Sequence, residues 1–163
     1  MSELALLGGS KTIEKELPAE TFKWPVITGD HRKAVLDVID RGAMSGRDVT
    51  DEFTAAYAKD FERKYALMCN NGTAAIHSGF WAMGVGCGDE VICPSITFWA
   101  SVLQVYSLGA TPVFADIDPE TLCLDPTDFE RCITERTKAV VVVHYAGHPA
   151  DMDRIMEIAD RHG

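Results

Sequence analysis

The chain has 163 residues, a length that fits one ordinary domain and allows a sizeable hydrophobic core. Apolar residues make up 47% of it and charged residues 25%, as is typical of globular proteins, and its formal net charge is −10. This acidic balance argues against nucleic acid or an anionic membrane as the main partner, because neither attracts a negatively charged protein.

Cysteine usage predicts neither a metal site nor a disulfide framework. The five cysteines are odd in number and scattered, and no two of them form a Cys-x-x-Cys pair: Cys69, Cys87, Cys93, Cys123 and Cys132. Reduced thiols in a cytoplasmic protein are the simplest interpretation. No apolar run reaches membrane-spanning length, and the first residues lack the pattern of a signal peptide.

The first part of the chain is predicted to be an irregular arm followed by a helix. Residues 1–29 contain two prolines, in Leu17-Pro18 and Trp24-Pro25, and the residue before each is disfavoured in a helix. Trp24 is costly to leave in water, so we expect the arm to dock. Asp30 is the expected N-cap of a helix that runs to about Arg41, and Gly42 is its expected stop.

A second amphipathic helix is predicted from about Val49 to Lys64. Phe53, Tyr57 and Phe61 recur in it at intervals of four residues, which places the three rings on one helix face. The simplest interpretation of this aromatic stripe is that it belongs to the core.

From Tyr65 onward, predicted strands and helices alternate. Strands are expected at 65–69, 90–93, 111–115 and 139–144, and helices at 73–83, 98–108, 125–133 and 151–163. Such alternation predicts a parallel sheet covered by helices on both faces. The run Val140–Val143 predicts a central strand, yet only one helix follows it. We therefore expect a fragment or a partner-dependent chain that exposes apolar surface when alone.

The stretch before the helix at 73–83 is the strongest candidate for a binding site. Asn70, Asn71, Gly72 and Thr73 are small or cap-prone, and Ala74 begins a run of helix formers. A helix N-terminus has unpaired backbone N–H groups and a partial positive charge, so it suits a phosphate or carboxylate. The Thr73 hydroxyl would add a donor. A capped helix without a ligand explains these residues equally well.

Several segments together resemble one enzyme family. They are Asn71-Gly-Thr-Ala-Ala75, Gly88-Asp-Glu-Val-Ile92 leading into Pro94-Ser-Ile-Thr-Phe98, Gly109-Ala-Thr-Pro-Val113, Asp116-Ile-Asp-Pro119, and Arg136-Thr-Lys-Ala139 leading to Val143-His-Tyr-Ala-Gly147 and Pro149-Ala-Asp-Met-Asp153. In this order they are similar to the DegT/DnrJ/EryC1/StrS family of pyridoxal-phosphate-dependent aminotransferases, which act on keto-sugars and keto-cyclitols.

The resemblance implies a cofactor, pyridoxal 5′-phosphate (PLP), and residues that bind it. The backbone N–H groups of Gly72 and Thr73 and the Thr73 hydroxyl would hold its phosphate, with Asn71 in place of the usual serine. Phe98 would stack on its pyridine ring, and ordinary packing is the alternative for this side chain. Trp99 would narrow the pocket or, as we favour, fill the core.

Three further residues are weaker substrate candidates. Ser45 falls in a loop that lies near the substrate in relatives, although an exposed loop without a ligand is equally plausible. His144 and Tyr145 follow a strand at its carboxyl end, where open α/β sheets place their ligands. A buried histidine with satisfied hydrogen bonds is the more common alternative for His144, and His77 is interpreted as a packing residue.

By the same resemblance, the fold class is α/β: the large domain of a fold type I PLP-dependent transferase, a three-layer α/β/α structure with a mostly parallel sheet, incomplete in this chain. Residues 1–29 would be an N-terminal arm and residues 30–163 the N-terminal part of the PLP-binding domain. The Schiff-base lysine and the aspartate that pairs with the pyridinium nitrogen would lie beyond Gly163, because Lys138 matches a non-catalytic position. The chain alone is then expected to be inactive.

The implied activity is transfer of an amino group from glutamate or glutamine to a keto-sugar or keto-cyclitol, by a homodimer that binds no metal. One alternative is a PLP-dependent sugar dehydratase of the same family. Another is a non-catalytic α/β domain that binds a phosphate-bearing ligand or a partner subunit. A dinucleotide-binding domain is disfavoured, because no Gly-x-Gly-x-x-Gly follows the first predicted strand.

Overall fold

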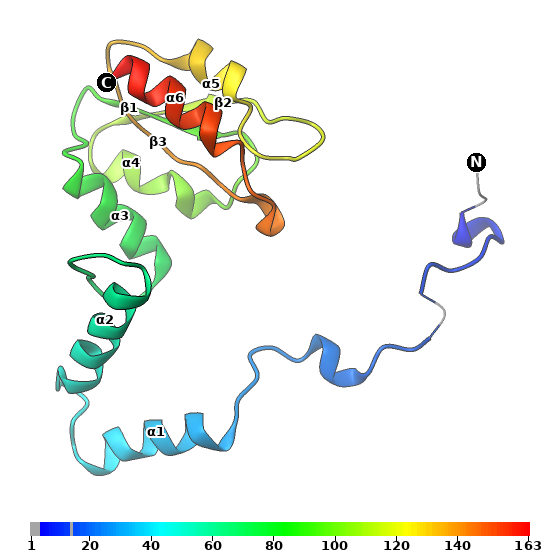
Figure 1. Cartoon of the computed structure of the whole chain (residues 1–163), viewed down its shortest axis with the longest axis vertical. Coiled ribbons are helices and arrows are strands. Elements are labelled where there is room, and N and C mark those ends of the chain that lie inside the picture. Colours follow the sequence, from blue (N-terminus) through cyan, green and yellow to red (C-terminus); the bar gives the residue numbers. More distant parts are fainter. Residues whose placement is uncertain (1–3, 14) are drawn as a thin grey trace. The chain divides into compact units, whose positions relative to one another are not determined.

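The computed structural model describes residues 4–13 and 15–163, and the chain divides into two units, Met1–Glu52 and Phe53–Gly163. The first unit holds two short 3-10 helices, η1 (Ala5–Leu7) and η2 (Ala19–Phe22), and the helix α1 (Gly29–Asp40) (Figure 1). Trp24 is 89% exposed, so the described part of the arm does not bury it.

Helix α1 begins two residues earlier than the sequence predicted. Its N-cap is Thr28 rather than Asp30: the His31 N–H donates to the Thr28 hydroxyl, and the Thr28 N–H donates to His31 Nδ1 at 3.0 Å. This reciprocal pair is a capping box in which histidine takes the place usually held by Glu or Gln. The predicted stop holds, since Gly42 adopts a left-handed conformation with φ of 62° after the helix ends.

Helix α2 (Asp48–Asp60) carries the aromatic stripe, and the prediction that the stripe belongs to the core is wrong for this chain. Phe53, Tyr57 and Phe61 remain exposed. Their rings contact one another instead, with centroids 5.9 Å apart for the first pair and 4.4 Å apart for the second. Helical spacing predicts that side chains share a face, but it does not say whether another element covers that face.

A three-stranded parallel sheet organises the second unit. Its strands are β1 (Glu90–Pro94), β2 (Thr111–Ala115) and β3 (Thr137–Val140), in the order β2-β1-β3. Every residue of β1 is buried, so β1 and not the valine-rich segment is the central strand. The valine run starts in β3, whose second edge pairs with no strand among residues 4–13 and 15–163. This corrects the prediction of a central strand at Val140–Val143.

The predicted strand at 65–69 does not form either. The segment from Tyr65 to Cys69 has no regular secondary structure, and its residues pair with none of the described strands. A short apolar segment becomes a strand only when a neighbour accepts and donates its backbone hydrogen bonds. The local sequence carries the apolar pattern but cannot supply that neighbour.

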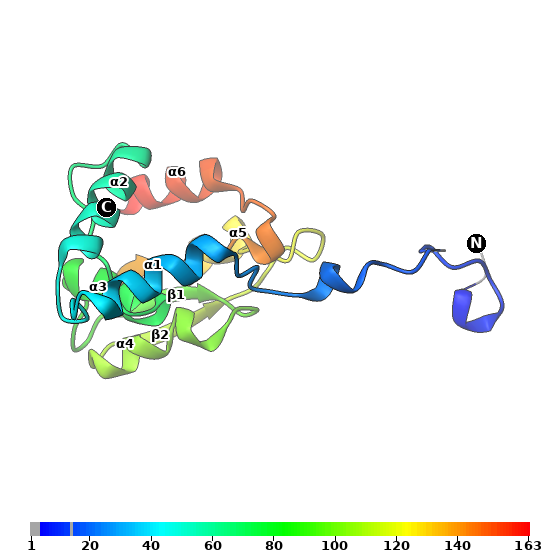
Figure 2. The ribbon, with the colours of Figure 1, turned by 90° about the horizontal axis from the view of Figure 1, so that it is seen from below.

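Helices cover both faces of the sheet, which gives three layers (Figures 1 and 2). On one face, Val91 and Cys93 of β1 pack with α3 (Gly72–Ala82) and α4 (Leu103–Ser107). On the other face, Ile92 packs with α5 (Pro126–Cys132) and α6 (Met152–His162). The alternation along β1 is that expected of a strand buried on both sides.

Two helices of this unit begin at aspartate caps, close to the predicted starts at 125 and 151. Asp125 caps α5, with Pro126 at its first position, and Asp151 caps α6 by accepting from the Arg154 N–H. The helix predicted at 98–108 is instead two short pieces, the 3-10 helix η3 (Trp99–Ser101) followed by α4. Nowhere in the described ranges is there a helix long and apolar enough to cross a membrane.

Candidate functional site

The N-terminus of α3 presents two free backbone amides. Asn71 is the N-cap, and its side-chain oxygen accepts a hydrogen bond from the Ala74 N–H at 2.8 Å. The Ala75 N–H donates to the Asn71 carbonyl at 3.2 Å. Within the described residues, no acceptor takes the N–H of Gly72 or Thr73, and the Thr73 hydroxyl has no partner. The terminus therefore offers two amides and one hydroxyl as donors.

The space beside Gly72, where a side chain would begin, is open. A Cβ built on Gly72 would meet no atom within 4 Å, and its φ lies outside the left-handed region. Neither packing nor backbone conformation in this chain therefore requires a glycine there. Because Cα–Cβ bonds in a helix tilt towards its N-terminus, a methyl group at this position would project to the side from which an anion approaches.

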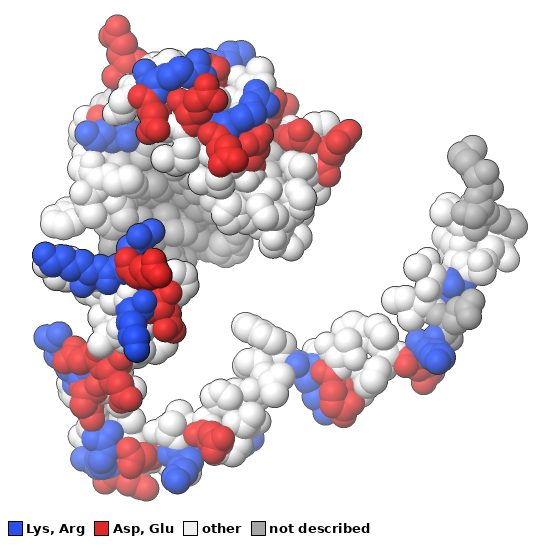
Figure 3. All heavy atoms as spheres, viewed as in Figure 1, with Lys and Arg blue, Asp and Glu red and all other residues white. Residues whose placement is uncertain are grey.

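The α3–α4 layer around this terminus carries no formal charge. No Asp, Glu, Lys or Arg occurs in the segments 65–88 and 91–115, which contain both helices. Charged side chains gather instead over α5 and α6 (Figure 3). An anion at the N-terminus of α3 would thus meet neutral donors and the helix dipole, with no carboxylate from this layer to repel it.

The helix α3 runs antiparallel to β1, so its N-terminus lies at the carboxyl edge of the sheet (Figures 1 and 2). At this edge β1 leads to α4 on one face, whereas β3 leads to α6 on the other. Loops that leave neighbouring strands towards opposite faces open a crevice, and this is where open α/β sheets bind ligands. The predicted phosphate site therefore lies at the edge where such sheets bind ligands.

Phe98 lies just beyond the carboxyl end of β1, with its side chain 65% exposed. Its ring centroid is 5.2 Å from that of Trp99, and the planes are tilted by 47°. Trp99 is 58% exposed, so our preference for a core position was wrong. The turn itself is anchored: Ser101 is buried, and its hydroxyl lies 2.7 Å from the Thr97 hydroxyl. The chain thus holds two aromatic rings on its surface just beyond the carboxyl end of β1.

The loop after β3 holds the other two candidates of this unit. His144 Nδ1 accepts a hydrogen bond from the Ala150 N–H at 3.1 Å, and Tyr145 follows in the 3-10 helix η4 (Tyr145–Gly147). Both side chains are exposed. Ala146 has φ of 50° and Gly147 has φ of 84°, which makes two consecutive left-handed residues. Nothing in the sequence pattern indicated the bond to Ala150 or the conformation of Ala146.

The remaining candidates do not extend this site. Ser45 lies in the first unit, exposed in the loop between α1 and α2. His77 is partly buried, with Nε2 3.3 Å from the Ser107 hydroxyl, which fits the packing interpretation. Burial raises the pKa of the Cys93 thiol to about 11, so this cysteine is protonated at neutral pH and is no nucleophile.

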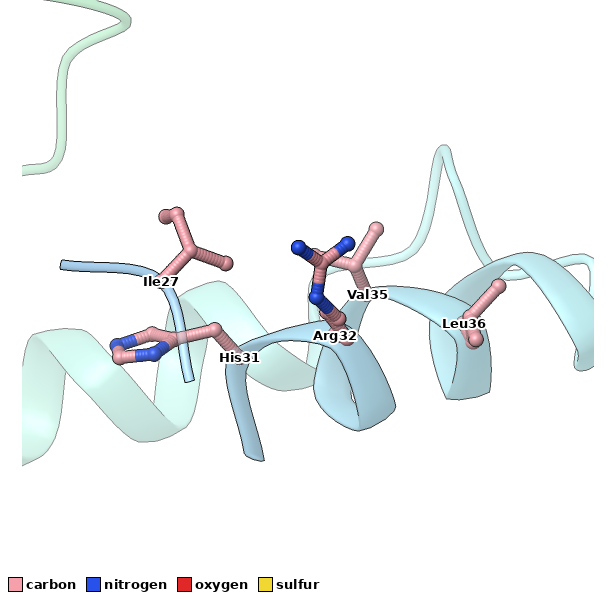
Figure 4. Close-up of a pocket in the computed structure, with 5 residues that line it drawn as sticks. All are labelled: Ile27, His31, Arg32, Val35 and Leu36. Carbon is pink, nitrogen blue, oxygen red and sulfur yellow. The ribbon is translucent and has the colours of Figure 1, made fainter. Parts of the chain in front are cut away.

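A pocket of about 360 Å³ on α1 has few groups that could bind or react with a ligand (Figure 4). It is lined by Ile27, His31, Arg32, Val35 and Leu36. Nδ1 of His31 is already engaged in the capping box, and the other lining groups are apolar except for one guanidinium. The pocket has neither a nucleophile nor a set of ligand-binding donors, so the candidate site stays at the carboxyl edge of the sheet.

Comparison with known proteins identifies the family. A sequence model of the DegT/DnrJ/EryC1/StrS aminotransferase family matches residues 25–163. The chain belongs to this family. GDP-perosamine synthase of Caulobacter vibrioides is 46% identical over 149 residues, which are 90% of this chain and 40% of that protein. The chain thus spans about 40% of the length of this curated relative.

Solved structures agree with the DegT-family assignment. An aminotransferase from Psychrobacter cryohalolentis is 38% identical, with a TM-score of 0.80 over 86% of this chain and 36% of its own. NtdA from Bacillus subtilis, solved with bound cofactor PMP, is 33% identical, with a TM-score of 0.75 over 83% of this chain and 32% of its own. These matches confirm the predicted fold class, part of a fold type I α/β structure, and PLP as the cofactor of the family.

Proposed function

We propose that this chain is the N-terminal part of the PLP-binding domain of an aminotransferase. The intact enzyme moves an amino group from glutamate or glutamine to a keto-sugar or keto-cyclitol. The observation that carries the proposal is the pair of free amides at Gly72 and Thr73, placed at the carboxyl edge of the sheet in an uncharged layer. The family match and the name of the GDP-perosamine synthase relative support the substrate class.

In this proposal the residues of the crevice bind the cofactor in two ways. The N–H groups of Gly72 and Thr73 and the Thr73 hydroxyl hold the phosphate, whose negative charge the helix dipole stabilises. The exposed ring of Phe98 stacks on the pyridine ring. When bound, the cofactor supplies the electron sink for amino transfer. The neutral donor set fits a phosphate dianion better than it fits a cation.

The amine that this chemistry needs comes from outside the residues of this chain. Lys138 is the last lysine of the sequence, and it lies exposed near the amino end of β3, away from the carboxyl edge that carries Phe98. We therefore propose that the Schiff-base lysine and the pyridinium-pairing aspartate follow Gly163 and that this chain alone does not catalyse the reaction.

We also propose that the intact protein is a cytoplasmic homodimer. The α3–α4 layer has no formal charge, yet it exposes large apolar side chains that water solvates poorly: Trp81, Met83, Trp99, Leu103 and Tyr106. Uncharged aromatic surface of this kind is typical of buried interface cores. The five cysteines are free thiols, which suits a reducing compartment.

The proposal is tested on the full-length polypeptide that contains this chain. After incubation with PLP and removal of free cofactor, we expect a visible absorbance band that borohydride abolishes, and loss of this band on addition of glutamate or glutamine. Return of the band on addition of a keto-sugar completes the amino transfer. Failure to bind PLP would favour a phosphate-binding or partner-binding domain, and release of water from the sugar without amino transfer would favour the dehydratase.

A further inference from the structure

The loop that follows β3 holds His144 in one hydrogen-bonding state. The Ala150 N–H donates to His144 Nδ1 at 3.1 Å, so Nδ1 is an acceptor and carries no proton. A neutral imidazole with an unprotonated Nδ1 carries its proton on Nε2. Nε2–H is therefore a neutral donor, and within the described residues it has no partner, while the side chain is exposed.

The backbone that carries this donor is unusually constrained. Ala146 adopts a left-handed conformation with φ of 50° and ψ of 24°, which is uncommon for a residue with a Cβ, and Gly147 follows with φ of 84°. The bond from Ala150 to His144 closes this turn across six residues. Left-handed non-glycine residues that the surrounding structure holds in place occur preferentially at ligand-binding sites.

The loop that carries His144 lies at the carboxyl edge of the sheet. β3 pairs with β1 in parallel, so His144 and Phe98 both lie beyond the carboxyl ends of adjacent strands. The connections from these strands leave towards opposite faces of the sheet, and this is the position at which open α/β sheets bind ligands. His144 therefore lies at the same edge of the sheet as Phe98.

We propose that His144 is a substrate-binding residue whose Nε2–H donates a hydrogen bond to an oxygen of a nucleotide-linked sugar. This inference rests on the proposed function and adds a specificity role for the β3 loop. A neutral donor suits the hydroxyl and carbonyl oxygens of a sugar, whereas the carboxylates of an amino donor would favour a cation such as arginine. His144 therefore contributes to binding of the sugar and not to binding of the amino acid.

Two substitutions separate this role from the structural role of the Ala150 bond. In His144→Asn the side-chain oxygen takes about the position of Nδ1, so it can accept from the Ala150 N–H, but the Nε2 donor is lost. In His144→Ala both interactions are lost. His148→Asn is the matched control, because it makes the same change at another exposed histidine of the same loop.

The experiment measures binding of GDP-perosamine to the full-length protein in its PLP form by calorimetry, with thermal unfolding and the rate of the glutamate half-reaction measured in parallel. We expect His144→Asn to unfold at the wild-type temperature, to bind GDP-perosamine about tenfold more weakly, as for loss of one hydrogen bond, and to keep the glutamate rate. His144→Ala should lose both stability and sugar binding, and His148→Asn should behave as wild type.

Wild-type affinity in His144→Asn would overturn the proposal and leave His144 with the structural role alone. An equal fall in the glutamate rate would overturn it too, since His144 would then act on the cofactor. A wild-type protein that shows the PLP band but does not bind GDP-perosamine would contradict the nucleotide-sugar assignment. Absence of the PLP band would contradict the proposed function itself, so the two failures are distinguishable.

Discussion

The side-chain oxygen of Asn71 accepts the Ala74 N–H at 2.8 Å, and this one bond decides which amides of α3 remain for a ligand. It satisfies the third amide of the helix and leaves those of Gly72 and Thr73 free. A cap that binds Ala74 without adding charge therefore stabilises the helix and keeps the terminus favourable for an anion.

Substitution of Asn71 should separate these two effects. We expect Asn71→Ala to lower the free energy of unfolding by about 1 kcal/mol, because the cap is lost. Asn71→Asp should keep the stability, since aspartate caps equally well, but should bind PLP more weakly because its carboxylate repels the phosphate. Urea unfolding and PLP titration of the full-length protein measure the two quantities. Equal PLP affinity in Asn71→Asp and wild type would contradict this account.

Truncation to alanine should affect PLP affinity at Phe98 and stability at Phe129. Phe98 is exposed, so Phe98→Ala should change the free energy of unfolding by less than about 0.5 kcal/mol while lowering PLP affinity about tenfold through lost stacking. Phe129 is 2% exposed in the core under α5, so Phe129→Ala should cost about 3–5 kcal/mol of stability. Unfolding curves and PLP titrations provide the comparison. A large stability loss in Phe98→Ala would place that ring in the core.

Stability should depend on pH through Glu90, at the amino end of β1. Its buried carboxylate accepts hydrogen bonds from the Thr134 hydroxyl at 2.5 Å and from the Arg136 guanidinium, and these lower the pKa of Glu90. Because the pKa is lower in the folded state, the stabilisation is present above about pH 4.5, near the ordinary pKa of a glutamate, and is lost as the pH falls through the folded-state pKa.

We therefore expect Glu90→Gln to be less stable than wild type at pH 7 and to approach it in strong acid. Urea unfolding at a series of pH values measures the difference. A difference that stays constant from pH 7 down to pH 3 would show that the ionised form of Glu90 contributes nothing. Glu130, which pairs with Arg161 on the surface, is the control site, because an exposed pair contributes little.

The backbone conformation at position 109 requires a glycine. Its φ is +77°, and a Cβ there would lie 2.5 Å from Cys87 Sγ. We expect Gly109→Ala to destabilise the protein by about 1–2 kcal/mol from the left-handed conformation. Cys87→Ala should recover only part of this in the double variant, because it removes the overlap with Sγ but not the backbone cost. Full recovery in the unfolding free energy would show that the overlap, and not φ, is the cause.

The sequence predicted the local features of this fold better than its long-range ones. Caps and stops depend on one or two residues, so Gly42 located the end of α1, and the helices predicted from 125 and 151 begin at the caps Asp125 and Asp151. The strand at 65–69 and the central position of Val140–Val143 were wrong, because pairing depends on neighbours that lie elsewhere in a structure. Local apolar patterns carry no information about which edge of a sheet is occupied.

The candidate site was predictable only in part, for a similar reason. The N-terminus of α3 was visible as cap-prone residues before helix formers, and the structure adds that Asn71 uses the amide of Ala74. Trp99 was assigned to the core because apolar side chains are usually buried, yet it lies on the surface beside Phe98. The bond between His144 and Ala150 spans a turn whose left-handed Ala146 no sequence rule indicates.

The most direct test of the central claim, that the amides of Gly72 and Thr73 hold the cofactor phosphate, compares the dissociation constants of pyridoxal and PLP. It uses the full-length protein and its Gly72→Ala and Gly79→Ala variants, since Gly79 lies on the same helix with equal space around it and serves as the control. We predict that wild type and Gly79→Ala bind PLP about 100-fold more tightly than pyridoxal. In Gly72→Ala this ratio should fall at least tenfold, while the free energy of unfolding stays the same. An unchanged preference in Gly72→Ala would contradict the account.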